Sequence, residues 1–156
     1  MHTGYTIILQ FCSMHIRLHF STCPNDTFMF YAMVHHKIDT YGHTFEVQTA
    51  DISELNTTAL SGAADMIKVS SQALGMLYKD YYLISSGSAM GHGCGPLLIA
   101  PKGKETDWAS GRVGVPGMHT TAHALLSMYQ PNIGNKEAHL FSDMLHLVES
   151  GALSAG

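Results

Sequence analysis

Residues 21–36 read S-T-C-P-N-D-T-F-M-F-Y-A-M-V-H-H, and this stretch decides the fold that we expect. Residues 16–20, directly before it, alternate between apolar and polar side chains, which is the period of a half-buried strand. Pro24 suits the first turn of a helix, and Asn25 and Asp26 are residue types that cap helix starts. The rest of the stretch is apolar enough for a helix that is buried on most sides. We therefore predict a strand, a tight turn and a buried helix.

The start of this helix is a candidate anion site, because its first N–H groups have no partner within the helix. Ser21 and Thr22 add hydroxyl groups to the same turn. The pattern also fits a well-capped turn in an ordinary α/β domain, and the spacing alone favours that plainer interpretation.

Composition excludes several classes of protein. The chain has 156 residues, of which 46% are apolar and 13% charged, so it can build a core and is not typical of disorder. Its net charge of −4, with histidines neutral, offers no basic surface to nucleic acid. No apolar run reaches the roughly 18 residues of a membrane span, and residues 5–12 lack the basic flank and cleavage site of a signal peptide. We expect a cytoplasmic protein with neither nucleic-acid nor membrane partners.

The spacing of the three cysteines predicts no disulfide framework or metal site. Cys12, Cys23 and Cys94 cannot all pair and show no C-x-x-C spacing, so we expect free or buried thiols.

The N-terminal segment differs from the rest of the chain. Residues 1–13 look unlike the sequence that follows, and Met14 directly precedes the first strand. Our hypothesis is that Met14 is the true start and that residues 1–13 are an extension that is not native.

Strand and helix patterns alternate along the rest of the first part of the chain, which predicts a mainly parallel sheet with helices on both faces. Asp51 and Ser53 can cap one of these helices, and Gly62 can end it. The expected strands are residues 45–48, 65–69 and 81–85, and the expected helices are residues 52–60 and 73–78.

A glycine-rich segment, residues 87–95, leads into an expected strand at 96–100 and matches neither a P-loop nor a dinucleotide fingerprint. After a polar surface loop at 101–110, a second α/β unit begins. Its expected strands are residues 112–116 and 138–141, and its expected helices are residues 123–129, opened by hydroxyl residues, and 144–149, capped by Ser142 or Asp143. We expect the following strand to be missing, so the second sheet looks thin and the sequence looks truncated.

Five segments carry a resemblance to a known family. They are S-T-C-P-N-D-T-F-M-F-Y-A-M-V-H at 21–35, A-D-I-S-E-L-N at 50–56, K-V-S at 68–70, G-S-A-M-G-H-G-C-G-P at 87–96 and V-P-G-M-H-T-T-A at 115–122. Together they resemble the 1,4-dihydroxy-6-naphthoate synthases, lyases of the futalosine route to menaquinone. The resemblance runs from about residue 16 to residue 156 and covers only the N-terminal part of the family.

The resemblance implies a type II periplasmic-binding-protein-like fold, in which two α/β lobes flank a cleft. Residues 14–98 would form the first lobe and residues 99–156 the start of a second, truncated lobe. The implied reaction converts cyclic dehypoxanthinyl futalosine, a small-molecule substrate, into 1,4-dihydroxy-6-naphthoate and a sugar-derived fragment. The resemblance implies no cofactor.

We expect three helix starts, at residues 21–26, 70–71 and 119–122, to converge on the cleft, where their N–H groups would suit the carboxylate of the substrate. Lys68 fits a solvated charge at a strand edge equally well. The expected substrate-binding residues are Ser21, Asn25, Asp26, Lys68, Val69, Ser70, Thr120, Thr121 and Ala122, of which residues 68–70 and 120–122 match positions that the resemblance implies are contacts.

No catalytic residue is expected within the chain, because the family's general base looks like a histidine on a strand beyond Gly156. We therefore expect weak binding or none, and no turnover. Two other functions stay open: a non-catalytic module of the same fold that binds small carboxylates, and a relative of chorismate dehydratase. His119 and His123 have helical i, i+4 spacing but lack a third ligand, so no metal site is expected.

Overall fold

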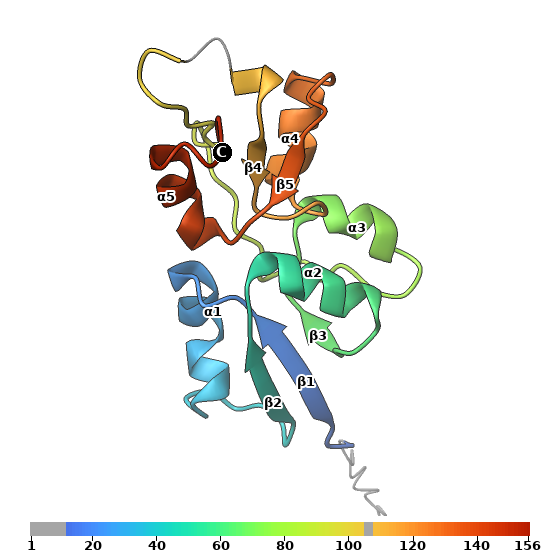
Figure 1. The fold of residues 1–156 in the computed structure, drawn as a ribbon. Coiled ribbons are helices and arrows are strands. Elements are labelled where there is room, and N and C mark those ends of the chain that lie inside the picture. The colour runs from blue at the N-terminus through green and yellow to red at the C-terminus, as the bar shows by residue number, and fades with distance from the viewer. Residues whose placement is uncertain (1–11, 105–107) are drawn as a thin grey trace, which may run out of the picture.

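The computed structural model describes residues 12–104 and 108–156, and it shows an α/β fold with two parallel sheets (Figure 1). The proposed extension, residues 1–13, lies almost wholly outside the described residues. The elements are β1 (His15–Phe20), α1 (Pro24–Val34), β2 (Thr44–Thr49), α2 (Ile52–Leu60), β3 (Met66–Ile67), α3 (Ser71–Leu77), β4 (Val113–Val115), α4 (Thr121–Tyr129), β5 (Lys136–Ala138) and α5 (Met144–Glu149), with short 3-10 turns at Trp108–Ser110 and Phe141–Asp143.

The first sheet has the order β2-β1-β3, and both pairs of strands are parallel, as the alternation predicted. Leu18 and Phe20 on β1 face α1, where the rings of Phe20 and Phe30 lie 4.8 Å apart. On the opposite face, Ile67 of β3 packs against buried residues of α2 and α3. Helices therefore cover both faces of this sheet (Figure 1).

The second sheet pairs β4 with β5, again in parallel, and Val113 and Val115 are buried in it. After α5 the chain returns to this sheet, where Ala155 forms a parallel bridge with Val113. Ile99 and Gly156 exchange two backbone hydrogen bonds, of 2.8 and 3.0 Å. The expectation that no strand-like segment follows the last helix is therefore wrong, since the buried end of the chain takes that place beside β4.

Two other expected strands are absent from the described residues. Residues 81–85 form no strand, and Tyr82 is fully exposed, because the short β3 pairs over only two residues and offers no ladder on which to extend the sheet. Residues 96–100 also lack regular structure, although Ile99 bonds to Gly156. β5 lies earlier than predicted, at Lys136–Ala138, because the next residues lead into a 3-10 turn.

Helix α1 begins at Pro24, as predicted, but its cap and its burial differ from the prediction. Cys23 occupies the N-cap position and makes no side-chain cap bond, whereas Asn25 and Asp26 lie inside the helix. Only Asp26 and Phe30 are buried along α1, because just one side of it packs on the sheet. Phe28 is 87% exposed and lines an open groove of about 440 Å³ with Pro24, Thr27, Tyr31 and Ala32.

The ends of the other helices follow their sequence signals more closely. Asp51 caps α2 by accepting a 2.9 Å hydrogen bond from the N–H of Ser53, and Gly62 ends that helix with a φ of +69°. Asp143 occupies the N-cap position of α5 but makes no side-chain cap bond. Across the described residues, no helix combines the length and the apolar character that a membrane span requires.

Candidate functional site

The site lies at the carboxyl ends of β1 and β3. In a parallel sheet ordered β2-β1-β3, the connections that leave the central strand diverge, and ligands of such sheets bind in the crevice at that point. Ser21 lies directly after β1 and Asp26 in the first turn of α1, and the turn after β3 carries Lys68 and Ser70. The fold therefore places these four predicted residues around one end of the first sheet.

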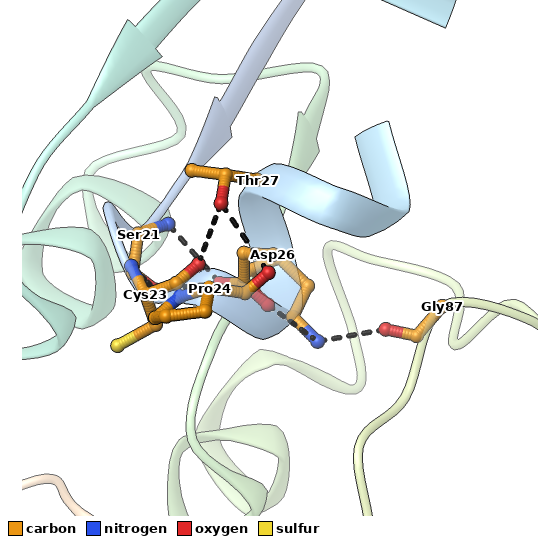
Figure 2. Close-up of polar contacts among 7 residues, drawn as sticks. Ser21, Cys23, Pro24, Asp26, Thr27 and Gly87 are labelled. Atoms are coloured by element: carbon orange, nitrogen blue, oxygen red, sulfur yellow. Dashed lines mark hydrogen bonds and ion pairs between the residues drawn. The ribbon is translucent and has the colours of Figure 1, made fainter. Parts of the chain in front are cut away.

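An ion pair between the buried Asp26 and the partly buried Lys68 joins the residues that follow β1 to those that follow β3. Asp26 accepts hydrogen bonds from the N–H of Ser21 at 3.1 Å and from its hydroxyl at 2.7 Å. The Nζ atom of Lys68 lies 3.4 Å from the other oxygen of Asp26 and donates to the carbonyl of Gly87 at 2.7 Å (Figure 2). The Lys68 side chain is 20% exposed, so the alternative interpretation of a solvated strand-edge charge is wrong.

This arrangement fixes the direction of the Lys68 ammonium. An ammonium carries three N–H donors, and the carbonyl of Gly87 accepts a hydrogen bond from one of them, while Asp26 forms an ion pair with the ammonium. The ammonium therefore has donor capacity left for a ligand. Asp26 thus supports Lys68 and is itself occupied by partners from within the protein.

The second half of the site consists of the starts of α3 and α4. Ser70 and Thr120 occupy the N-cap positions of these helices. The N–H of Gln72 donates to the hydroxyl of Thr121 at 3.3 Å, so the two helix starts lie against each other. Thr120 is buried, and its hydroxyl donates to the carbonyl of Gly117 at 2.7 Å and accepts from the N–H of His123 at 3.3 Å. Thr120 therefore stabilises the turn between β4 and α4.

Three of the predicted binding residues lie apart from this cluster. Asn25 is exposed in the first turn of α1, and Val69 packs against the buried residues of α2 and α3. Ala122 lines a separate, mostly apolar hollow of about 500 Å³, together with residues such as Leu97 and Leu125. The role of these three residues in binding stays a prediction.

Asn56 also lies in this region, although it was not among the binding residues predicted from the sequence. Its side chain is fully buried in α2, between the buried residues Leu55 and Ala59. Its amide group contacts Ser70 at the start of α3 and the carbonyl of His119 before α4. The sequence held one signal for this residue: an amide side chain among the apolar residues of one helix face. A buried polar group requires hydrogen-bond partners, so such a position predicts a structural contact.

Histidines and cysteines add no metal centre to the part of the chain that the structure describes. His123 has one ring nitrogen 2.7 Å from the carbonyl of Met118 and the other 3.4 Å from the hydroxyl of Ser127, so both are engaged. Within residues 12–104 and 108–156, no group of three or more His, Cys, Asp or Glu side chains is placed to hold a metal ion. The three cysteines are free thiols, as expected.

A sequence profile described as menaquinone biosynthesis matches residues 16–153, nearly the whole chain. The chain belongs to this menaquinone-biosynthesis family. The assignment confirms the resemblance carried by the five sequence segments, because the matched range includes all of them.

Two curated members of the menaquinone-biosynthesis family are similar to the chain, and both are named 1,4-dihydroxy-6-naphthoate synthase. The protein from Thermus thermophilus is 39% identical over 141 residues, which are 90% of this chain and 51% of the relative. The protein from Streptomyces coelicolor is 31% identical over 146 residues, with the same two coverages. The chain spans about half the length of the curated relatives it matches.

A solved structure is also similar to this member of the family. The crystal structure of a protein from Archaeoglobus fulgidus matches with a TM-score of 0.83 and 31% sequence identity. The match covers 91% of this chain and 52% of that protein. The likeness supports the α/β fold described above, including its arrangement of two parallel sheets.

Proposed function

We propose that this chain supplies the N-terminal part of a 1,4-dihydroxy-6-naphthoate synthase. In the proposed reaction, cyclic dehypoxanthinyl futalosine is converted into 1,4-dihydroxy-6-naphthoate in the cytoplasm, as a step of menaquinone biosynthesis. The observation that carries the proposal is the ammonium of Lys68, held by Asp26 at the carboxyl edge of the first sheet. A partly buried cation beside helix starts suits a substrate that carries a carboxylate.

The proposed architecture is the two-lobed, type II periplasmic-binding-protein-like fold, with residues 14–98 as one lobe and 99–156 as part of the other. The backbone pairing of Ile99 with Gly156 supports this boundary, because it ties the chain to the second sheet from residue 99 onward. The contact between Gln72 and Thr121 then lies between the lobes, where a ligand cleft is expected.

In the proposed binding mode, the carboxylate of the substrate accepts a hydrogen bond from the ammonium of Lys68 and lies near the starts of α3 and α4. Ser70 and Thr121 supply hydroxyl groups from the two sides. Ser21 and Asp26 keep the lysine in place, and Thr120 shapes the turn before α4. Asn25, Val69 and Ala122 complete the proposed set of contacts.

We assign no general base within these residues, and we expect the chain to bind without converting the substrate. A non-catalytic module that binds small carboxylates is therefore the second candidate, favoured by the same Lys68–Asp26 pair. The chorismate dehydratase alternative has less support, because both curated relatives carry the naphthoate synthase name.

Calorimetric titration of residues 1–156 with 1,4-dihydroxy-6-naphthoate tests the proposed site. We expect binding that falls about tenfold or more in Lys68→Met, because a hydrogen bond to a charged group contributes about 1.5–3 kcal/mol. The matched control is Lys102→Met, which removes an exposed lysine and leaves the affinity unchanged. Ser70→Ala gives a second test that keeps the Lys68–Asp26 pair. No binding by the wild-type chain, or equal affinity of all four proteins, would contradict the proposed site.

A second experiment separates the two candidate functions. The cyclic substrate is incubated with a chain in which residues 1–156 continue into the C-terminal half of the Thermus thermophilus relative. Under the synthase proposal, the substrate is consumed and a naphthoate chromophore forms. Binding of the substrate without its consumption would favour the carboxylate-binding module.

A further inference from the structure

Asn56 has every hydrogen-bonding group of its side chain engaged. Its Nδ2 atom donates to the hydroxyl of Ser70 at 3.1 Å and to the carbonyl of His119 at 3.2 Å. Its Oδ1 atom accepts from the N–H of Ser70 at 2.9 Å. An amide has two N–H donors and one carbonyl, so no further polar contact is needed to satisfy this buried side chain.

These partners belong to different sheets. Ser70 follows β3 and begins α3, whereas His119 follows β4 and lies just before α4. Asn56 itself lies on α2, which packs with α3 on the first sheet. One side chain therefore links the first sheet and its helices to the turn that leads out of the second sheet.

The backbone of that turn comes unusually close to α2. Gly117 has a φ of +142°, and a side chain at this position would collide with Ser53 in the first turn of α2. The hydrogen bond from Gln72 of α3 to Thr121 of α4 makes a further contact across this junction. Asn56 is fully buried at this junction, where water cannot replace its hydrogen bonds.

We infer that Asn56 is a positioning residue that sets the placement of the second sheet against the first, and with it the spacing between the starts of α3 and α4. The geometric part of this inference stands on its own, and its consequence for ligand binding rests on the proposed function. Asn56 acts through Ser70 and the turn before Thr121 and is not itself a ligand contact. Its loss separates the two sheets while each keeps its own fold.

Asn56→Asp is the sharpest variant, because it preserves the size of the side chain and the acceptor for the N–H of Ser70. It replaces the donor that faces the carbonyl of His119 by a carboxylate oxygen, which repels that carbonyl. Asn132→Asp is the matched control, since it makes the same change on an exposed residue of the second sheet's side. Leu77→Ala is a second control, which weakens the apolar core of the first sheet without touching the junction.

The separation of the sheets is measured in the absence of ligand. Spin labels are placed on cysteines introduced at Leu60 and Met128, which are exposed on α2 and α4, after the three native cysteines are changed to serine. We expect one narrow distance distribution in the wild type, Asn132→Asp and Leu77→Ala. We expect a longer and broader distribution in Asn56→Asp, and the same in Asn56→Ala, which removes all three hydrogen bonds.

An unchanged distribution in both Asn56 variants would overturn the inference. So would an equal broadening in Leu77→Ala, since the effect would then follow from lost stability alone. Unfolding of both Asn56 variants, seen by circular dichroism, would also overturn it. Under the inference, Asn56 positions the two sheets, and each sheet keeps its fold without it.

Titration with 1,4-dihydroxy-6-naphthoate then tests the consequence for the site. Misplacing the two helix starts is expected to weaken binding about tenfold in Asn56→Asp and to leave Asn132→Asp unchanged. If no protein binds the naphthoate but the distances change as expected, the proposed function fails and the positioning role of Asn56 stands. If binding is seen and both distances and affinities are unchanged in Asn56→Asp, the positioning role fails and the proposed function stands.

Discussion

The turn after β1 and the turn after β4 begin from similar sequence patterns and use their polar side chains differently. After β1, Asp26 in the first turn of α1 bonds to Ser21 and pairs with Lys68, so the charge of a residue that follows β3 lies beside this helix start. In the second, the hydroxyl of Thr120 caps its own helix and bonds within its own turn. A strand–turn–helix unit can thus form a charged site when one of its side chains pairs with a distant residue. It forms an uncharged cap when its side chains bond only within the unit.

Among the polar contacts, the largest effect is expected at Asp26. Asp26→Ala leaves both donors of the buried Ser21 without their acceptor and removes the carboxylate beside the partly buried Lys68, which should lower the free energy of unfolding by about 3 kcal/mol. Urea denaturation measures this change. Asp26→Asn should cost less, because an amide oxygen still accepts from Ser21. An effect of Asp26→Ala as small as that of Asp80→Ala, which removes an exposed carboxylate, would remove the contrast between the turns.

A smaller effect is expected at the neutral turn. Thr120→Ala removes the N-cap of α4 and should lower the free energy of unfolding by about 1 kcal/mol. Thr120→Ser keeps the hydroxyl and should recover most of that stability, as thermal unfolding can show. A Thr120→Ala variant that lost as much stability as Asp26→Ala would mean that the two turns matter equally for stability.

An exposed charge pair gives a still smaller effect and sharpens the comparison between buried and solvated charges. Two hydrogen bonds from the Arg17 guanidinium and one from its backbone N–H hold the pKa of Asp65 well below its usual value. A lowered carboxyl pKa stabilises the folded state at pH values above the unfolded pKa of about 4, and this stabilisation is lost as the pH falls toward the folded pKa.

Asp65→Asn should therefore lower the melting temperature slightly at pH 7, and the difference from wild type should shrink as the pH is lowered below about 4. Melting curves recorded from pH 7 to pH 2 measure this trend. Because the pair is open to solvent, added salt should also reduce the difference at pH 7. A difference that grew as the pH fell would contradict the stated effect of Arg17 on the pKa of Asp65.

The smallest effect is expected on the outer side of α1. Phe28 is 87% exposed, so Phe28→Ser should change the free energy of unfolding of residues 1–156 by no more than about 0.5 kcal/mol. Phe30→Ala, two positions along, should cost about 3 kcal/mol, because its ring packs on Phe20 in the core. Similar costs at both positions, measured by urea denaturation, would show that the groove on α1 is covered in solution.

Local patterns predicted most of the elements but not their long-range contacts. The order of elements from β1 to α3, the cap of α2 at Asp51 and the parallel pairing all followed from periodicity and turn residues. Residues 81–85 have the composition of a strand and form none, because a strand also requires a partner, which composition does not reveal. Asp26 is a residue type that caps helices, but its ion pair is with Lys68, which lies far along the chain and could not be predicted from the local sequence.

The candidate site was predicted in part for the same reason. The resemblance implied contacts at Lys68, Ser70 and Thr121, and the helix-start argument added Ser21. The fold places these residues at adjoining turns and helix starts. The ion pair of Lys68 with Asp26 and the hydrogen bonds of Asn56 depend on how the chain folds back on itself. Periodicity describes neighbours along one element and carries no information on such contacts.

The backbone pairing of Ile99 with Gly156 and of Val113 with Ala155 bears on the order in which the protein folds during synthesis. Chains leave the ribosome from the N-terminus, and folded units form as their residues become available. All three strands of the first sheet precede residue 68, so that sheet can assemble while later codons are being translated. β4 gains its second neighbour only when residue 155 has emerged, so the second sheet is completed after translation has passed that residue.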